Sequence, residues 1–289
     1  MSFINPYFSE NVPWLRGNLH AHTTNSDGAR APQKVVDAYA SAGYDVLAIS
    51  DHDYVTDLTA LDARGMILLS ANEVTANGPH ILHVGATERL EPHGDRRRVL
   101  QAIQSSPGFA VVNHPNWERD FAHCPQAELA GWDGYTGIEI YNGVVRRLEG
   151  NPVATDRWDQ LLSAGRRVWG FAHDDSHRPG DDAIAWLMVQ SADRTADAVI
   201  AAMEAGRFYC STGVTIERIH VDGRSVRLDT ANAQRIVVHS DFGHREMAAD
   251  ASSMSFTLPE DSMATYVRVE CWGPGEAMAW TQPFFVARG

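Results

Sequence analysis

Short apolar runs alternate with segments whose apolar residues recur every three or four positions, up to about residue 213. The runs predict buried strands, and the recurring pattern predicts helices with one apolar face. Because the links between them are short, the pattern favours a parallel barrel built from βα units. The expected strands cover 14–19, 45–49, 66–70, 80–85, 109–112, 137–142, 167–172 and 186–189, and the expected helices cover 32–42, 58–64, 96–105, 155–164 and 196–206.

The helical pattern ends after Gly213, and short strand-like segments separated by turns follow. Asp222-Gly223 is a typical hairpin turn between two of them. We therefore expect two parts: a barrel of residues 1–213 and an antiparallel, sandwich-like β module of residues 214–289. The expected strands of the module cover 215–221, 226–228, 235–239, 253–258, 266–271 and 283–286.

The predicted strand–helix–strand unit of residues 17–53 carries polar side chains at both strand ends. His20 and His22 are two positions apart on a strand, so their imidazoles point the same way. Asp27 follows in the next turn, and the second strand ends at Asp51-His52-Asp53. Imidazoles and carboxylates at the carboxyl edge of a parallel sheet are typical ligands of a divalent metal.

Later strand ends supply more side chains of the same kind, and Asp175 with His177 repeats the spacing of the first histidine pair. The candidate ligands are His20, His22, Asp27, His52, Glu73, His80, His114, Asp175 and His177. Nine nitrogen and oxygen ligands are too many for one ion and suit two or three, such as Mn, Fe or Zn. Lys34, the only lysine, lies on the first helix, which leaves Glu73 as the candidate bridge between ions.

The segments LHAHTTNSDG and AISDHD resemble the first two motifs of the PHP family, named for polymerase and histidinol phosphatase. The resemblance extends over about residues 16–215 and implies a distorted (β/α)7-type barrel of the α/β class. It also favours His80 over His83 as the ligand on the fourth strand, because family strands carry it five residues before a glycine, here Gly85. The implied metal groups are His20, His22, Glu73 and Asp175; Glu73, His80 and His114; and Asp27, His52 and His177.

A metal-dependent hydrolase is the function that this resemblance implies, and phosphoesterase chemistry by metal-bound hydroxide is our expectation. The residues expected to be catalytic are His20, His22, Asp27, His52, Glu73, His114, Asp175 and His177. An alternative is a carboxylic or carbamate ester hydrolase, because HDDSH and QPFF resemble segments of such a branch, although His173 stands where threonine is usual. A second alternative is a non-catalytic PHP module, which should have lost several of the nine ligands.

Composition and charge restrict the partners. A net charge of −13 argues against a nucleic-acid partner and requires metals and local arginines to hold an anionic substrate. We therefore expect a small-molecule phosphoester as the substrate, and the sequence leaves a homo-oligomer open. The absence of a leader or a long apolar run, and three widely spaced cysteines, predict a cytoplasmic protein without a membrane span.

Other polar residues near strand ends have less definite roles. Tyr141, Asn142, Asn116, Trp117 and Arg178 are candidates for substrate contact, whereas Arg146 and Arg147 fit a solvated loop as well as a phosphate site. Asp174 is expected to support its neighbour Asp175. The histidines expected to be surface or structural residues are His83, His93, His123, His173, His220, His239 and His244.

Overall fold

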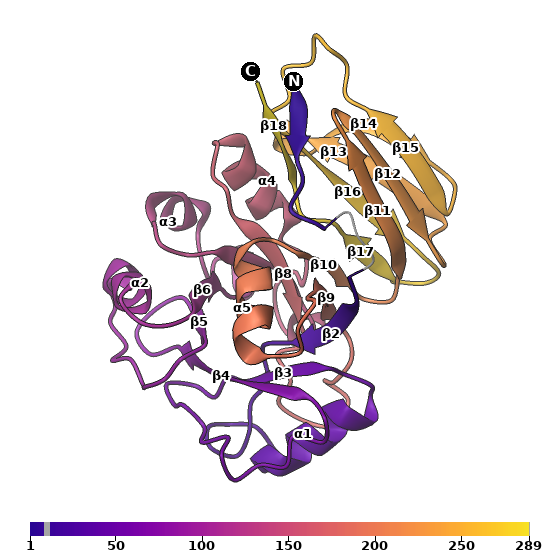
Figure 1. Ribbon diagram of the computed structural model, residues 1–289. Coiled ribbons are helices and arrows are strands. Elements are labelled where there is room, and N and C mark those ends of the chain that lie inside the picture. Colours follow the sequence, from indigo (N-terminus) through magenta and orange to yellow (C-terminus); the bar gives the residue numbers. More distant parts are fainter. Residues whose placement is uncertain (9–11, 289) are drawn as a thin grey trace.

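The structure is a computed structural model that describes residues 1–8 and 12–288 (Figure 1). It is an α/β fold with an antiparallel β module at the carboxyl end, as the sequence predicts. The main sheet runs in the order β10-β9-β2-β3-β4-β5-β6-β7-β8. Its strands are β2 (Trp14–Asn18), β3 (Val46–Ile49), β4 (Ile67–Val74), β5 (Ile81–Val84), β6 (Phe109–Val112), β7 (Gly137–Asn142), β8 (Trp169–His173), β9 (Trp186–Gln190) and β10 (Phe208–Ser211).

This sheet is mixed rather than wholly parallel. Strands β2, β3 and β4 run parallel to one another, and so do β6, β7 and β8. Strand β5 is antiparallel to both of its neighbours, and β9 is antiparallel to β2 and β10. The amino end of β5 therefore lies at the same edge as the carboxyl ends of β4 and β6.

Helices surround this sheet in Figure 1. They are α1 (Pro32–Ser41), α2 (Arg96–Gln104), α3 (Gln126–Gly131), α4 (Thr155–Ser163) and α5 (Ala196–Glu204), with 3-10 turns η1 (Arg119–Phe121), η2 (Val144–Arg147) and η3 (Asp241–Gly243). The apolar face of each long helix packs inward; Val35, Val36 and Tyr39 of α1 are buried, for example. None of the helices in the described chain combines the length and the apolar character needed to cross a membrane.

The prediction of a helix over residues 58–64 is wrong, because this segment forms turns. The side chain of Asp57 accepts the backbone N–H of Thr59, and that of Asp62 accepts the backbone N–H of Arg64. Aspartates that bond the backbone two residues ahead stabilise turns in competition with a helix. Residues 208–211, for which the sequence predicted no element, form strand β10 and continue the sheet.

The carboxyl-terminal module has two sheets that enclose a second apolar core. Strand β10 pairs with β17, so one of these sheets continues the main sheet without a break. Strand β1 pairs with β18, and the two termini lie side by side in Figure 1. The strands are β1 (Ser2–Ile4), β11 (Ile216–Asp222), β12 (Ser225–Thr230), β13 (Arg235–Ser240), β14 (His244–Ala249), β15 (Ser253–Thr257), β16 (Tyr266–Trp272), β17 (Met278–Trp280) and β18 (Phe284–Ala287).

A buried ion pair joins the module to the main sheet. The guanidinium of Arg268 on β16 donates to both carboxylate oxygens of Asp159 on α4, each at 2.7 Å. Gln282, before β18, bonds the backbone N–H and carbonyl of Gly170 on β8. These contacts fix the module against α4 and β8. The division of the chain at residue 213 stays a prediction.

Candidate metal centre

The nine predicted ligands lie at one edge of the main sheet. His20 and His22 follow β2, His52 follows β3, and Glu73 lies near the end of β4. His114 follows β6, whereas Asp175 and His177 follow β8. His80 precedes β5, and the reversed direction of this strand brings it to the same edge as the others.

Glu73 lies at the centre of the cluster and is fully buried. Its Oε1 is 3.2 Å from Nε2 of His20 and 3.2 Å from Nε2 of His114. The other oxygen, Oε2, is 2.8 Å from Nδ1 of His52. Two further imidazole nitrogens face this carboxylate: Nδ1 of His80 at 3.2 Å and Nε2 of His22 at 3.7 Å. A carboxylate in this position can bridge two cations.

Asp175 is the second buried carboxylate of the cluster. Its Oδ1 lies 3.2 Å from Nε2 of His20 and 3.1 Å from Nε2 of His22. Asp175 has a φ of +55° and His114 a φ of +26°, a region that residues with a Cβ rarely adopt. Such strained backbone persists only where the surroundings impose it, and it concentrates at functional sites.

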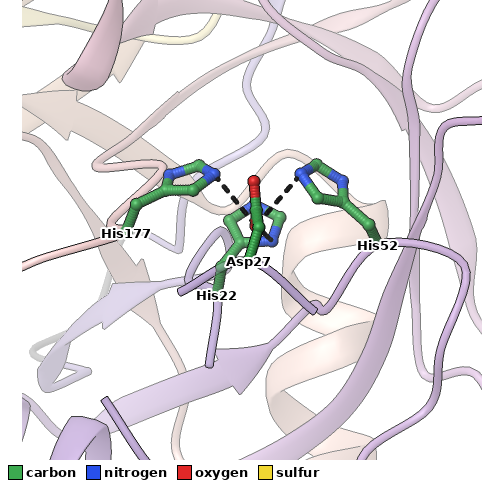
Figure 2. A group of neighbouring side chains, drawn as sticks. All are labelled: His22, Asp27, His52 and His177. Carbon is green, nitrogen blue, oxygen red and sulfur yellow. Dashed lines mark ion pairs between the residues drawn. The ribbon is translucent and has the colours of Figure 1, made fainter. Parts of the chain in front are cut away.

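Asp27 forms a more open part of the cluster, shown in Figure 2. Its Oδ1 lies 3.4 Å from Nε2 of His52 and 3.4 Å from Nε2 of His177. His22 Nδ1 lies 3.9 Å from the same oxygen. Because the side chain of Asp27 is 57% exposed, this group faces solvent, whereas the side chains of Glu73 and Asp175 are buried.

Burial and the charges of neighbouring side chains act in opposite directions on the pKa values of the cluster. Burial disfavours the charged form of His52, but the neighbouring carboxylates of Asp27 and Glu73 outweigh burial and raise its pKa to about 10. Burial also opposes protonation of His177, and the bond to Asp27 again raises the pKa. Burial lowers the pKa of His22 to about 4.

The two buried carboxylates stay ionised for the same reason. Burial by itself would raise the pKa of Glu73, but the charges of His20 and His80 hold it well below its ordinary value. Burial opposes ionisation of Asp175 as well, and His20 and His22 lower its pKa. The two ionised carboxylates therefore give the cluster a buried negative charge that attracts protons or cations.

Several buried atoms of the cluster that could bind a metal have no hydrogen-bond partner within residues 1–8 and 12–288. They are Nε2 of His20, both ring nitrogens of His22, Oε2 of Glu73, Nδ1 of His114 and Oδ1 of Asp175. Buried polar atoms are rarely left unsatisfied. Ligand atoms within 4.8 Å of one another form the groups His22, Asp27, His52, His177; His20, His22, Glu73; and His20, His114, Asp175. These donors and spacings fit divalent metals.

Glu139 on β7 is a functional candidate that the sequence reasoning missed. Its Oε1 accepts hydrogen bonds from Nδ1 of His20 and of His173, each at 2.8 Å. Its Oε2 accepts the backbone N–H of His114 at 2.8 Å and the amide of Asn142 at 2.9 Å. A carboxylate on Nδ1 turns Nε2 of His20 toward the cluster. The available signal was a glutamate inside an apolar run, a position that requires a partner.

His80 and His83 have different surroundings in the structure. His80 faces Glu73, whereas Nε2 of His83 donates to the carbonyl of Pro107 at 2.8 Å, outside the cluster. His123 is buried, and its Nε2 accepts the backbone N–H of His80 at 3.0 Å. His173 is buried against Glu139, so both have structural contacts. His93, His220 and His244 are exposed, and His239 is half-buried.

Two aspartates next to the cluster hold its loops. Asp174 accepts three backbone N–H groups from residues 183–185 and the hydroxyl of Tyr39. Asp51 accepts the backbone N–H and hydroxyl of Thr23 and the hydroxyl of Ser26. The hydrogen bonds of Asp51 therefore fix the turn that carries Asp27.

A cavity of about 250 Å³ opens onto the cluster. Beside the candidate ligands it is lined by Trp117, Val144, Val145, Arg147 and Leu148. Arg147 forms a two-pronged ion pair with Asp181, at 3.0 and 2.7 Å, which holds its guanidinium at the wall. Arg146 instead pairs with Glu276, and Arg178 is exposed. Asn142 and Asn116 are buried in hydrogen bonds to the protein.

The fold resembles that of a protein with a predicted PHP-like domain. No protein-family model matches the sequence. A two-domain protein from Bacteroides vulgatus that contains a predicted PHP-like metal-dependent phosphoesterase has the same fold, with a TM-score of 0.57 and 14% identity over 99% of this chain and 90% of that one. The resemblance to the PHP family predicted from the motifs is thus confirmed in the fold.

A short sequence match to a curated protein accompanies this likeness in fold. The 3',5'-nucleoside bisphosphate phosphatase of Chromobacterium violaceum is 36% identical over 72 residues, which are 23% of this chain. The match spans a quarter (25%) of the length of that phosphatase.

Proposed function

We propose that the protein is a metal-dependent phosphoesterase that hydrolyses a small-molecule substrate. The observation that carries this proposal is the cluster around Glu73, where buried nitrogen and oxygen donors without partners in the described chain lie below a cavity. A structural PHP module would not need to keep such a set of unsatisfied ligands at an accessible surface. The fold neighbour with a predicted metal-dependent phosphoesterase supports the proposal.

Two or three divalent ions, such as Mn, Fe or Zn, would be held by the groups implied by the family resemblance. His20, His22, Glu73 and Asp175 would hold one ion, and Glu73, His80 and His114 a second. Asp27, His52 and His177 would hold a third at the exposed end. When bound, these ions supply a water of lowered pKa and offset the negative charge of a phosphoryl group.

The side chains of the protein itself orient the ligands and the substrate. Glu139 fixes the tautomer of His20, so that Nε2 remains free to bind an ion. Arg147, held by Asp181, places a positive charge at the cavity wall, where it can attract a phosphoryl oxygen. This local charge is needed because the chain as a whole carries −13.

The reaction class is tested by substrate comparison after reconstitution with each metal. A phosphomonoester, a phosphodiester and an aryl carboxylic ester are incubated with the protein between about pH 6 and 9, where a metal-bound water ionises. Turnover of a phosphoester is the expected result, and nucleoside bisphosphates belong in the panel because the Chromobacterium violaceum relative bears that name. Cleavage of the carboxylic ester alone would replace the proposal by the ester hydrolase alternative.

A further inference from the structure

A second hollow, of about 490 Å³, lies next to the metal cavity. Val145 and Leu148 line both spaces, so the two spaces meet at the turn η2 and the residue after it. The second hollow is the larger of the two, and none of the nine candidate ligands lines it. It therefore adjoins the proposed reaction site without being part of it.

The two walls of this hollow come from different parts of the chain. Tyr141, Pro152 and Val153, on and after β7, line one side. Trp272, at the end of β16, and Met278, at the start of β17, line the other. In Figure 1 the hairpin of β16 and β17 lies beside the main sheet, which agrees with the pairing of β17 with β10.

Two large apolar side chains of the hollow are exposed, beside the charged pair Arg146 and Glu276. Trp272 is 46% exposed and Leu148 41% exposed, although side chains of this size are usually covered. A flat aromatic ring packs well against an indole and aliphatic side chains, because aromatic pairs gain free energy beyond the apolar area they bury. Arg146 and Glu276 form an ion pair of 3.0 Å across the rim, and exposed pairs of this kind open at little cost.

We propose that this hollow is a leaving-group subsite that binds an aromatic or heteroaromatic ring attached to the phosphoester. The inference rests on the proposed function, because the phosphoryl group of the same molecule would lie in the metal cavity. The carboxyl-terminal module then determines specificity through Trp272, while the main sheet holds the metals. Trp272 contacts the ring and has no part in the chemistry.

The test compares two phosphomonoesters with wild type and Trp272→Ala. For 2-naphthyl phosphate, we expect the substitution to raise KM by about five- to tenfold at unchanged kcat, the usual scale of an aromatic contact. For glycerol phosphate, which has no ring, we expect both constants to stay unchanged. Trp272→Phe should recover most of the loss, and Phe242→Ala, which removes an exposed aromatic on η3 outside this hollow, should have no effect.

Equilibrium dialysis of 2-naphthol against the metal-loaded protein separates this inference from the proposed function, because it needs no turnover. Weaker binding to Trp272→Ala than to wild type supports the subsite even if neither phosphoester is hydrolysed, an outcome that would overturn the phosphoesterase proposal alone. Equal binding of 2-naphthol to both proteins, or an equal change of KM for both substrates, would overturn the subsite.

Discussion

Glu73 connects more of the cluster than any other single residue described above, because its two oxygens face imidazoles of His20, His22, His52, His80 and His114. Its negative charge is what holds cations or protonated imidazoles together in a buried space. The surrounding imidazoles keep it ionised, as its lowered pKa shows despite burial. A change of this one charge therefore tests the centre more directly than a change of any single imidazole.

Glu73→Gln keeps the shape of the side chain and removes the charge. We expect the variant to lose at least one bound metal per chain and to lose activity by more than about 100-fold, because an amide cannot bridge two cations. Elemental analysis, steady-state kinetics and circular dichroism check metal, activity and fold. Glu91→Gln, at an exposed ion pair, is the matched control. A variant with full metal and normal turnover would show that Glu73 is not the bridge.

His80 and His83 give opposite predictions although they lie on one short segment. His80→Ala should lower metal content and activity, because its ring faces Glu73. His83→Ala should leave both unchanged but lower the free energy of unfolding by about 1–3 kcal/mol, because a buried bond to Pro107 is lost. Metal analysis and urea unfolding of both variants measure the difference. A larger loss of metal and activity in His83→Ala than in His80→Ala would contradict the placement of His80, before β5, in the cluster.

The sequence predicted the nine cluster residues because strand ends and an i, i+2 spacing are local signals. Asp175 and His177 could be recognised in this way without knowing their neighbours. The contacts of Glu139 could not, because they join β7 to residues after β2, β6 and β8. Such contacts depend on strand order, which local periodicity does not contain.

At the scale of elements, strand direction explains the placement of His80. An alternating pattern of strands and helices predicts parallel strands, but only a short turn separates β4 from β5, and it is too short for a crossover. The two strands therefore pair antiparallel, and the first residue before β5 reaches the carboxyl edge. The expected helix over 58–64 failed for a different reason, since its aspartates bond nearby backbone and stabilise turns.

The ion pair between α4 and β16 should determine how firmly the module is attached. Arg268→Ala leaves the buried carboxylate of Asp159 without its strongest partner, and we expect a loss of about 3–5 kcal/mol in the free energy of unfolding. Arg235→Ala, which removes an exposed pair with Asp250, should cost less than about 1 kcal/mol. Urea unfolding measures both. Similar small losses would show that the buried pair adds nothing to the attachment.

At the scale of the whole molecule, the main sheet and the module are less separate than a boundary at residue 213 suggests. The chain pattern changes there, and this change could be seen in the sequence. The pairing of β10 with β17, and of β1 with β18, could not, because it joins segments far apart in the sequence. The module thereby lines the second hollow, which adjoins the metal cavity, through the β16–β17 hairpin.

The charge of the whole cluster predicts how metal binding and stability depend on pH. In the metal-free protein the pKa of His52 is raised to about 10, so this imidazole carries a proton at neutral pH, and the raised pKa of His177 keeps its proton bound to a higher pH than in a free imidazole. A group with a raised folded pKa stabilises the fold below its unfolded pKa of about 6.5, and this contribution is lost as pH rises through the folded value. For His52 that window extends to about pH 10. The metal-free protein should therefore lose stability as pH rises from about 7 to 10.

Metal binding should have the opposite dependence, because an imidazole must lose its proton to become a ligand. The carboxylates of Glu73 and Asp27 are already ionised and release none, since their pKa values are lowered. Each proton displaced from His52 or His177 makes the apparent affinity rise about tenfold per pH unit. Calorimetric titration with Zn²⁺ or Mn²⁺ in buffers of different ionisation enthalpy counts these protons. His244→Gln, at an exposed imidazole, should behave like wild type, whereas an affinity independent of pH between about 6 and 8 would contradict the proposed role of both histidines.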